Sequence, residues 1–277
     1  MSRKVFKLDC FITVHMSRNK YRKVTECQVN AMKRLALEGK SIRQIRDIMN
    51  ISLSLVYYHV KELIPKQSRK LNLNGISESQ IGELMGAFAG DGSFYISLHK
   101  GIRHYKTRYT LCTKTEEERV YIGHLQELLR RLNLNPYILN REKEGCLDIG
   151  LNSKGYFNLI TKFLVWEGKK ALSVRLRLDF NAYSKEFLTS FARGLMDTDG
   201  WVSNSNVSCG SISKNLIADV AKIFTKFDII YTRSKRNAKN NQKELYLIRV
   251  RKQSLQKYLE IIGFSNPRKL NKLKAIL

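Results

Sequence analysis

Two stretches of the chain carry nearly the same pattern, and both end in Asp-Gly. LMGAFAGDG occupies residues 84–92 and ARGLMDTDG occupies residues 192–200. In each stretch apolar residues recur at helical spacing, and the pattern stops at an acid followed by glycine. A pattern that occurs twice in one chain predicts two related halves. It also puts Asp91 and Asp199 at the same structural point of both halves, which makes them a candidate pair of ligands.

A stripe of small residues runs along each of these two expected helices. Gly82, Gly86 and Gly90 follow each other every fourth residue in the first, as do Ser190, Gly194 and Thr198 in the second. Glycine inside a helix costs about 1 kcal/mol relative to alanine. A row of small residues is explained if the two helices pack backbone to backbone. If they also run parallel, their C-terminal ends meet.

Two aspartates placed together at helix C-termini are unfavourable on structural grounds alone. A carboxylate at the negative end of a helix dipole is disfavoured, and two carboxylates repel each other. A divalent cation reverses both effects, and oxygen ligands suit Mg²⁺, for which Mn²⁺ is a substitute. The alternative is that each aspartate only ends a helix before a glycine turn.

The segments that follow each motif repeat in the same order. Ser77 and Gln80 have the spacing of a capping box ahead of the first motif helix. Alternating and helical patterns then predict two strands, a helix, two strands and a helix, so that each half reads αββαββα. In the first half these segments are 94–98, 108–112, 116–132, 137–139, 147–151 and 156–164, and in the second 201–203, 207–211, 214–227, 230–234, 245–250 and 254–262.

Ahead of the repeat, the pattern predicts three short helices. Thr25, Ser41 and Ser52 are candidate N-caps, and Pro65 ends the third helix. Two short helices joined by a tight turn are typical of a helix-turn-helix, whose last helix enters the major groove of DNA. The alternative is a small bundle that serves only for packing. The outward residues of the third helix would be Ser52, Ser54, Tyr57, Tyr58, His59 and Lys61.

The net charge of +26, from 50 Lys+Arg against 24 Asp+Glu, favours a polyanionic partner, first of all double-stranded DNA. No apolar run approaches the length of a membrane span, and the N-terminus does not fit a signal peptide, so we expect an intracellular protein with access to DNA and no membrane partner. The five cysteines contain no CxxC pair, and the histidines lack metal spacing, which disfavours zinc.

The two motifs resemble those of the LAGLIDADG homing endonucleases in their single-chain, two-repeat form, over residues from about 77 to 277. The resemblance implies an α+β fold of two pseudo-symmetric halves that form a saddle of antiparallel sheets, preceded here by the small all-α domain. It implies that Asp91 and Asp199 are metal ligands, and the residues before them, Gly90 and Thr198, are included in the predicted metal site. Ala89 departs from the pattern at a place where many members have an acid, and Asp197 keeps that acid.

A second family feature is a basic residue after the last helix of each half. Lys170 in EGKKAL and Lys269 in NPRKL match it, with the register uncertain by one residue at Lys169. The resemblance implies metal-dependent hydrolysis of one phosphodiester on each DNA strand, with the two lysines stabilising the developing charge. It gives the strands the task of reading DNA.

Alternation along the strands predicts which residues face DNA. Phe94, Ile96, Leu98, Tyr109 and Leu111 are expected to point inward. The outward set is Ser93, Tyr95, Ser97, Lys106, Arg108 and Thr110 in the first half, and Trp201, Ser203, Ser208, Arg233, Lys235, Arg249 and Arg251 in the second. The alternative is an ordinary polar face of a half-buried sheet.

The sequence therefore predicts four segments: an N-terminal arm and helix-turn-helix at 1–63, a basic linker at 64–76, and the two repeats at 77–180 and 181–277. We expect a monomer, since both halves lie in one chain, and an asymmetric target, since the halves differ. Two other functions stay open: a non-catalytic DNA-binding regulator of the same fold, and an intron RNA-splicing maturase, for which intron RNA is a further partner. The resemblance also implies a role in intron homing.

Overall fold

Hydroxyl side chains begin most helices of this protein, and the two units of the chain are built from such capped helices. A computed structural model describes residues 24–63, 71–99, 101–141, 145–203, 205–238 and 243–277. They divide into two compact units, one before and one after residues 64–70. The expected N-terminal arm at 1–23 and the first part of the expected linker lie outside the described residues.

The smaller unit consists of three helices, α1 (Glu26–Leu37), α2 (Ile42–Met49) and α3 (Leu53–Val60). Thr25, Ser41 and Ser52 each accept a hydrogen bond from a backbone N–H three residues on, as expected of N-caps. Its core holds Met32, Ala36, Ile45, Val56 and Val60. On α3 and its ends, five of the six residues predicted to face outward are exposed, and His59 is half-buried with its ring edge-on to Tyr58.

The larger unit contains the two halves in the predicted order, which confirms the fold class. The first half is α4 (Glu78–Asp91), β1 (Gly92–His99), β2 (Ile102–Cys112), α5 (Glu116–Arg131), β3 (Tyr137–Arg141), β4 (Cys146–Asn152) and α6 (Lys154–Phe163). The second half is α8 (Lys185–Asp199), β7 (Gly200–Ser203), β8 (Asn206–Ser211), α9 (Lys214–Lys226), β9 (Tyr231–Arg236), β10 (Leu245–Val250) and α10 (Leu255–Ile261). The capping box of Ser77 and Gln80 is present.

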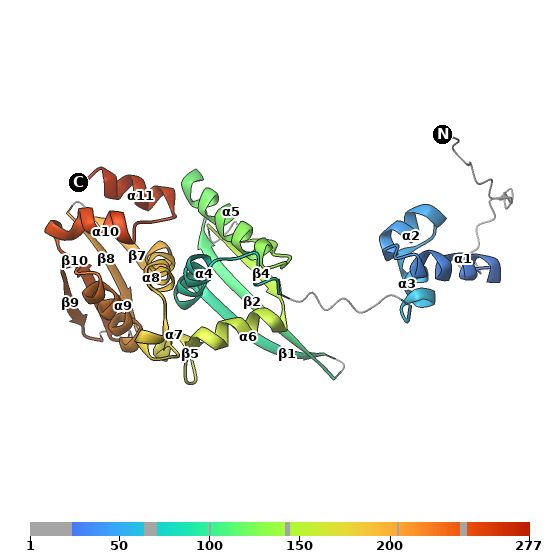
Figure 1. The fold of residues 1–277 in the computed structure, drawn as a ribbon, viewed down its shortest axis with the longest axis horizontal. Coiled ribbons are helices and arrows are strands. Elements are labelled where there is room, and N and C mark those ends of the chain that lie inside the picture. The colour runs from blue at the N-terminus through green and yellow to red at the C-terminus, as the bar shows by residue number, and fades with distance from the viewer. Residues whose placement is uncertain (1–23, 64–70, 100, 142–144, 204, 239–242) are drawn as a thin grey trace. The chain divides into compact units, whose positions relative to one another are not determined.

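Short elements follow each half. After α6 come β5 (Leu164–Val165), α7 (Lys170–Ser173), β6 (Arg175–Leu176) and the 3-10 turn Phe180–Ala182. A second 3-10 turn, Lys252–Ser254, precedes α10, and α11 (Pro267–Lys274) ends the chain. The four-stranded sheets have matching orders, β1-β2-β4-β3 and β7-β8-β10-β9, and every pairing is antiparallel. Figure 1 shows α4 and α8 side by side between these two sheets.

The small residues of α4 and α8 let the two backbones touch. A Cβ atom added to Gly86 would lie 2.0 Å from the carbonyl oxygen of Phe191, and one added to Gly194 would lie 2.1 Å from that of Glu83. At the N-terminal end of the contact, the hydroxyls of Ser79 and Ser190 are 2.7 Å apart. The predicted packing of one small stripe against the other is therefore confirmed.

Cross-strand pairing fixes which residues share a face of each sheet, because directly opposite residues in an antiparallel pair point the same way. In the first sheet Ser93 pairs with Arg108, and Tyr95 with Lys106, so the six predicted outward residues share one face. Tyr109 and Leu111 are buried on the other. Ile96 and Leu98, expected to be buried, are 47% and 71% exposed, because the β1–β2 hairpin extends past the helices that cover the sheet.

In the second sheet the predicted face of β9 is wrong. Arg249 pairs with Ser208, and Ser208 with Trp201, which places these three on one face as expected. Arg233, however, pairs with buried Ile248, and Lys235 pairs with Tyr246. Both basic residues therefore lie on the helix side of the sheet, in surface pockets beside α9. The predicted alternation along β9 is correct, but it is shifted by one residue, so that Arg233 and Lys235 were assigned to the wrong face.

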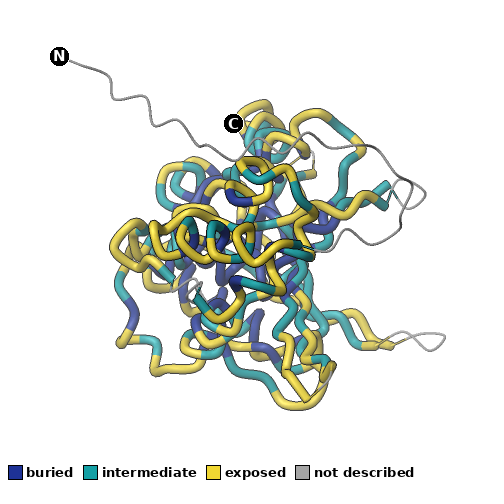
Figure 2. The backbone as a smooth tube through the Cα atoms, turned by 90° about the vertical axis from the view of Figure 1, so that its right-hand side faces the viewer, coloured by how far each residue is buried: buried dark blue, intermediate teal, exposed yellow. Residues whose placement is uncertain are grey.

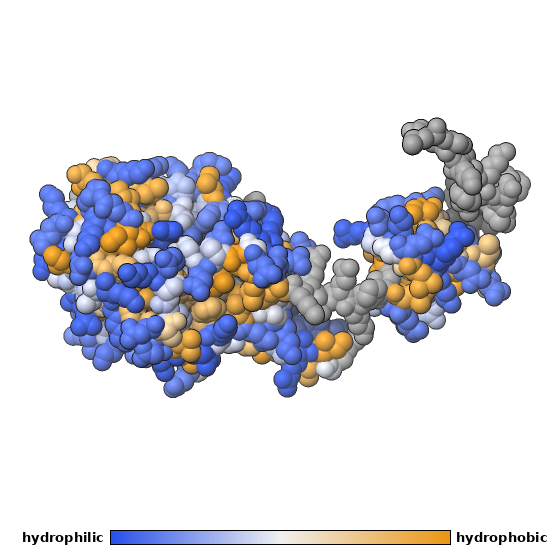
Figure 3. All heavy atoms as spheres, in the orientation of Figure 1, coloured by the Kyte–Doolittle hydropathy of each residue, from blue (hydrophilic) through white to orange (hydrophobic). Residues whose placement is uncertain are grey.

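The apolar core of the larger unit lies between the sheets and the helices that cover them. Buried residues gather in the interior, and exposed residues lie on the outer helices and loops (Figure 2). Hydrophilic residues dominate the visible surface, interrupted by apolar patches (Figure 3). Within the described ranges, every helix is too short or too polar to cross a membrane.

Residues 71–76, expected in the linker, contact the first half. The backbone N–H of Asn72 donates to the carbonyl of Leu132, and Leu71 packs against the core and lies over Gly155. The chain is therefore attached to the first half before α4 begins.

Adding one methyl group between α4 and α8 should destabilise the protein. We expect Gly86→Ala to lower the free energy of unfolding by about 2 kcal/mol or more, because its Cβ would overlap the backbone of α8. Gly123→Ala on exposed α5 is the matched control, since nothing lies within 4 Å of its Cβ position. It should be neutral or stabilising by up to about 1 kcal/mol. Urea denaturation measures both, and equal effects would contradict the close packing.

Candidate active site

The two motif aspartates lie at the joined ends of α4 and α8. Asp91 and Asp199 are the last residues of their helices, and a strand begins directly at Gly92 and at Gly200. A Cβ atom on Gly90 would lie 2.9 Å from a carboxylate oxygen of Asp199. Asp199 therefore lies directly beside the residue that precedes Asp91. The parallel contact of the helices, which the small residues permit, brings the two acids together.

Each helix end carries a lysine that binds its last carbonyl groups. Lys170, the first residue of α7, places Nζ 2.7–2.8 Å from the carbonyl oxygens of Phe88, Ala89 and Gly90. Lys269 in α11 does the same to Met196, Asp197 and Thr198 at 2.6–3.1 Å.

The structure thus selects Lys170 rather than exposed Lys169 as the counterpart of Lys269. An ammonium group has three donors. Each lysine uses them on carbonyls of the last helical turn, where the helix itself supplies few donors. Phe88 and Met196 also accept the capping N–H of Gly92 and Gly200. In this arrangement the lysines act on the acids through their charge.

Each of the two aspartates lies among residues of the opposite half. Asp91 lines a cavity of about 320 Å³ together with Lys269, Thr198 and Trp201, which all belong to the second half. Asp199 lines a second cavity of about 320 Å³ together with Ala89, Gly90 and Ala171, which belong to the first half. Lys269 attracts Asp91 more strongly than Lys170 does, whereas Lys170 attracts Asp199 more strongly than Lys269 does. Each aspartate is therefore grouped with the lysine of the opposite half.

Burial raises the pKa of both acids, and repulsion by Asp199 adds to the rise for Asp91. Loss of water, followed by the charge of Asp199, raises the pKa of Asp91 from 3.8 to about 7, although both lysines oppose the change. Burial raises the pKa of Asp199 as well. It also lowers the pKa of Lys170 to about 8, against the pull of the two acids, and lowers that of Lys269. The site therefore holds charges at a cost to the folded state.

The donors at this site fit a hard divalent cation with two protein carboxylates. Among the described residues, no three His, Cys, Asp or Glu side chains gather into a metal cluster. Two carboxylates kept from water and repelling each other favour a bound cation, and Mg²⁺ typically keeps several waters alongside one or two carboxylates. The carbonyls of Gly90 and Thr198, included in the predicted site, each accept a lysine hydrogen bond and retain a second lone pair.

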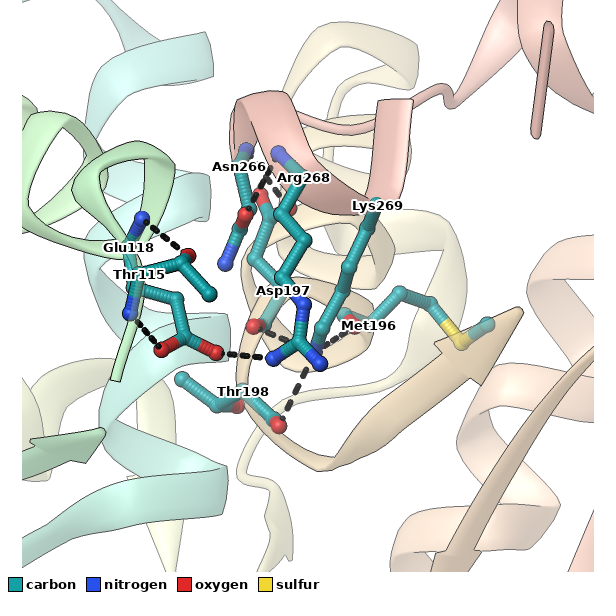
Figure 4. Close-up of polar contacts among 8 residues, drawn as sticks. All are labelled: Thr115, Glu118, Met196, Asp197, Thr198, Asn266, Arg268 and Lys269. Carbon is teal, nitrogen blue, oxygen red and sulfur yellow. Dashed lines mark hydrogen bonds and ion pairs between the residues drawn. The ribbon is translucent and has the colours of Figure 1, made fainter. Parts of the chain in front are cut away.

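Asp197, the acid kept only in the second motif, holds α11 in place. Its two carboxylate oxygens accept hydrogen bonds from the backbone N–H groups of Ser265 and Asn266, at 3.0 and 2.9 Å. Asn266 is the N-cap of α11, three residues before Lys269 (Figure 4). In the first half Ala89 cannot make these bonds, and α7 is a single turn without a side-chain cap. Asp197 is thus a positioning residue for Lys269.

Sequence reasoning missed an ion pair that spans the cavity of Asp91. Arg268 of α11 binds Glu118 of α5, which also caps its own helix with Thr115 (Figure 4). The pair joins the two halves across the cavity. The position three residues after the cap of α9 is Leu216, and the described residues that line the cavity of Asp199 include no arginine, lysine or second acid. Only the spacing of Thr115 and Glu118 hinted at this glutamate, and it indicated a capping box.

Apart from Trp201, which lines the cavity of Asp91, the other predicted contacts do not line the two cavities of this site. The outward residues of the first sheet lie on its outer face, together with Trp201, Ser203, Ser208 and Arg249 in the second. Arg251 follows the end of β10 and caps a 3-10 turn. The exposed residues of α3 belong to the separate N-terminal unit.

Neutralising one acid should stabilise the metal-free protein at alkaline pH. Because the pKa of Asp91 is raised from 3.8 to about 7 on folding, the folded protein binds more protons than the unfolded chain between those values. This carboxyl therefore lowers stability as pH rises through that window. We expect Asp91→Asn to exceed wild type in free energy of unfolding by about 1–4 kcal/mol at pH 8 in EDTA, and by much less at pH 4.

Urea denaturation across this pH range measures the difference. Glu127→Gln, which removes a carboxylate from an exposed ion pair with Arg131 on α5, is the control and should show no such trend. A variant less stable than wild type at pH 8 would show that the ionised acid stabilises the fold.

Comparison with known proteins identifies a family domain in the second half. A LAGLIDADG-like domain matches residues 186–263, which cover most of the second half. The replication factor C small subunit of Methanocaldococcus jannaschii is 30% identical over 200 residues, 72% of this chain. The present chain spans only 10% of the length of that protein.

Solved structures share the fold over most of the chain. I-DmoI in complex with DNA and Ca has a TM-score of 0.55 at 15% identity, over 72% of this chain and 98% of that one. I-DmoI in complex with DNA and Mn has a TM-score of 0.51 at 17% identity, over 68% and 98%. The matched domain lies in the second half, and the first half repeats its architecture and its acid. The second half therefore matches a LAGLIDADG-like domain, and the larger unit shares its fold with I-DmoI, with an all-α unit ahead of it in the sequence.

Proposed function

We propose that this protein is a site-specific endonuclease that cuts both strands of a long, asymmetric DNA target with the help of a divalent metal. The observation that carries the proposal is the site itself, where two acids and two lysines meet at the joined helix ends. A regulator that only binds DNA gains nothing from this costly group of buried charges. The I-DmoI structures with DNA and Ca or Mn support both DNA as substrate and a divalent metal.

Asp91 and Asp199 would hold the metal, Mg²⁺ or Mn²⁺ in its place, with the carbonyls of Gly90 and Thr198 as further oxygen donors. When bound, the metal lowers the pKa of water and neutralises charge that develops on the phosphate. Lys170 and Lys269 favour the ionised form of both acids, against burial, and supply a positive field beside each cavity. Because each aspartate is grouped with the lysine of the opposite half, the site provides one catalytic centre for each DNA strand. One phosphodiester is then hydrolysed in each strand.

The outer faces of the two sheets would read the target. Their exposed or half-buried polar residues include Arg108, Thr110 and Arg249, which suit base edges and phosphates. Because the two faces differ in sequence, the preferred site is asymmetric, and a monomer suffices to bind it. The N-terminal unit would extend the contact through α3. Arg233 and Lys235 lie on the helix side of their sheet, so they are not part of this DNA-reading surface.

Cleavage of a randomised duplex library in Mg²⁺ tests the proposal. Wild type should produce double-strand ends at one long asymmetric sequence, whereas Asp91→Asn and Asp199→Asn should each lower the rate at least about 100-fold. Thermal unfolding supplies a second readout. Mg²⁺ should raise the melting temperature of wild type and not that of the variant that combines Asp91→Asn with Asp199→Asn. Glu127→Gln should behave as wild type in both.

Two results would contradict the proposal. Tight binding to DNA without metal-dependent cutting, unchanged in both variants, would leave a DNA-binding regulator. Splicing of an intron RNA that depends on the presence of the protein, with no DNA cut at any sequence, would leave a maturase.

The exposed face of α3 should add affinity at one end of the target. We expect a Tyr57→Ala, Lys61→Ala double variant to bind its site at least about tenfold more weakly and to lose footprint protection at that end only. The cut position should not change, because the catalytic centres lie in the other unit. Arg34→Ala on α1, where the arginine forms an exposed pair with Glu38, is the control. An unchanged footprint would show that the small unit does not bind the target.

A further inference from the structure

A carboxylate is buried on the outer face of the first sheet, among residues expected to meet DNA. Asp148 of β4 lies opposite Thr110 of β2 and Leu139 of β3, so all three share that face. The aspartate is only 1% exposed, whereas Leu139 is 42% exposed. An acid in this place repels phosphate and is costly to bury, so its surroundings must compensate for its charge.

Two arginines from the neighbouring strands cover this carboxylate. Arg108 on β2 places Nε 3.3 Å from Oδ2 of Asp148, and Arg141 on β3 places Nε 3.6 Å from the same oxygen. The hydroxyl of Thr110 donates to Oδ1 at 2.7 Å. Strand register puts Arg108 level with Gly150 and Arg141 level with Cys146, on opposite sides of Asp148 along β4. The two guanidinium groups thus converge on one buried oxygen from opposite directions.

The sheet itself does not need this ion pair. Gly92 pairs with Tyr109 in the first half, as Gly200 pairs with Cys209 in the second, which aligns Thr110 with Gly210. Gly210 pairs with Leu247, so leucine occupies the position equivalent to Asp148. The same architecture is therefore built with an apolar residue here, and buried ion pairs often add little to stability. The buried acid is better accounted for by a function than by stability.

We propose that Asp148 is a positioning residue that holds Arg108 and Arg141 in place to read two guanines in the half of the target bound by the first sheet. This inference rests on the proposed function, since it requires that this face meets DNA. Contact through Nε fixes the stem of each side chain, and a guanidinium has more N–H donors than one carboxylate oxygen accepts. Arginine pairs through two hydrogen bonds with the O6 and N7 acceptors of guanine.

The geometry limits how far apart the two guanines lie. Both Nε atoms are within 3.6 Å of the same oxygen, so they are separated by at most about twice the rise of ~3.4 Å per base pair. We therefore expect the two guanines to lie close together in the same half of the site. Fixing both guanidinium groups before DNA arrives also removes part of the entropy lost on binding.

Sequencing of duplexes bound by the full-length protein from a randomised library, in EDTA so that nothing is cut, tests this inference. Wild type should enrich two guanines, adjacent or nearly so, in one half of its site. Asp148→Asn should reduce both preferences at least about fivefold while the rest of the site changes little. Arg108→Lys and Arg141→Lys keep the charge beside Asp148, and each should lose the guanine at one position only.

Thermal unfolding of each variant guards against a purely structural effect. If Asp148→Asn does not fold, the two lysine variants decide the question alone. Glu127→Gln is the control for removal of an arginine-paired carboxylate away from the sheet, and its site should match that of wild type.

The outcomes separate this inference from the proposed function. An enriched site without paired guanines, or lysine variants that keep both, would overturn the role of Asp148 and leave the endonuclease intact. Uniform weakening across all positions in Asp148→Asn would also overturn it. If wild type enriches no sequence and cuts no DNA, the proposed function fails together with the inference.

Discussion

Direct contact between the backbones of α4 and α8 sets the arrangement of every other element in the larger unit. Glycines at 86 and 194 leave no space for a side chain between the two helices. This contact aligns the helices in parallel and ends them at the same level. It thereby relates the two halves by approximate two-fold symmetry and places one sheet on each side. The cost of glycine within helices is the cost of this alignment.

The same contact creates an electrostatic problem that the site resolves in part. Two aspartates at the negative ends of two helices repel each other, and burial adds to the cost, so the pKa of Asp91 rises to about 7. Lys170 and Lys269 bind the last carbonyls of the helices and compensate both the dipoles and the acids. A divalent cation is suited to neutralise the negative charge that remains at the site. Local instability and proposed function thus have the same origin.

The two halves share a backbone plan but differ in the devices that complete it. Asp197 anchors α11 through two backbone N–H groups, whereas Ala89 leaves α7 a single turn. Asp148 gathers two arginines on the first sheet, whereas Leu247 takes that place on the second. One chain with two unequal halves is suited to an asymmetric duplex, because each half can change its contacts without changing the shared helix pair.

Local signals in the chain were enough to locate the elements and to pair the two acids. Hydroxyl caps, apolar periodicity and the two Asp-Gly endings identified most strands, the equivalence of Asp91 and Asp199, and the helices other than α7 and α11, which carry the two lysines. The spacing of small residues even predicted which faces of the helices meet, because a row without side chains is costly in a helix unless another backbone packs against it. Strand phase was less secure, since one residue reverses a face, and it was wrong for Arg233 and Lys235.

Packing in three dimensions was needed to establish which groups from distant segments meet. The choice of Lys170 over Lys169, the grouping of each aspartate with the lysine of the other half, and the buried acid beneath Arg108 depend on contacts across strands and between halves. The sequence of β4 shows an aspartate within a strand, but not that arginines from two other strands cover it. Local patterns record which residues a helix or strand can hold, whereas burial and charge pairing arise only when those elements are packed together.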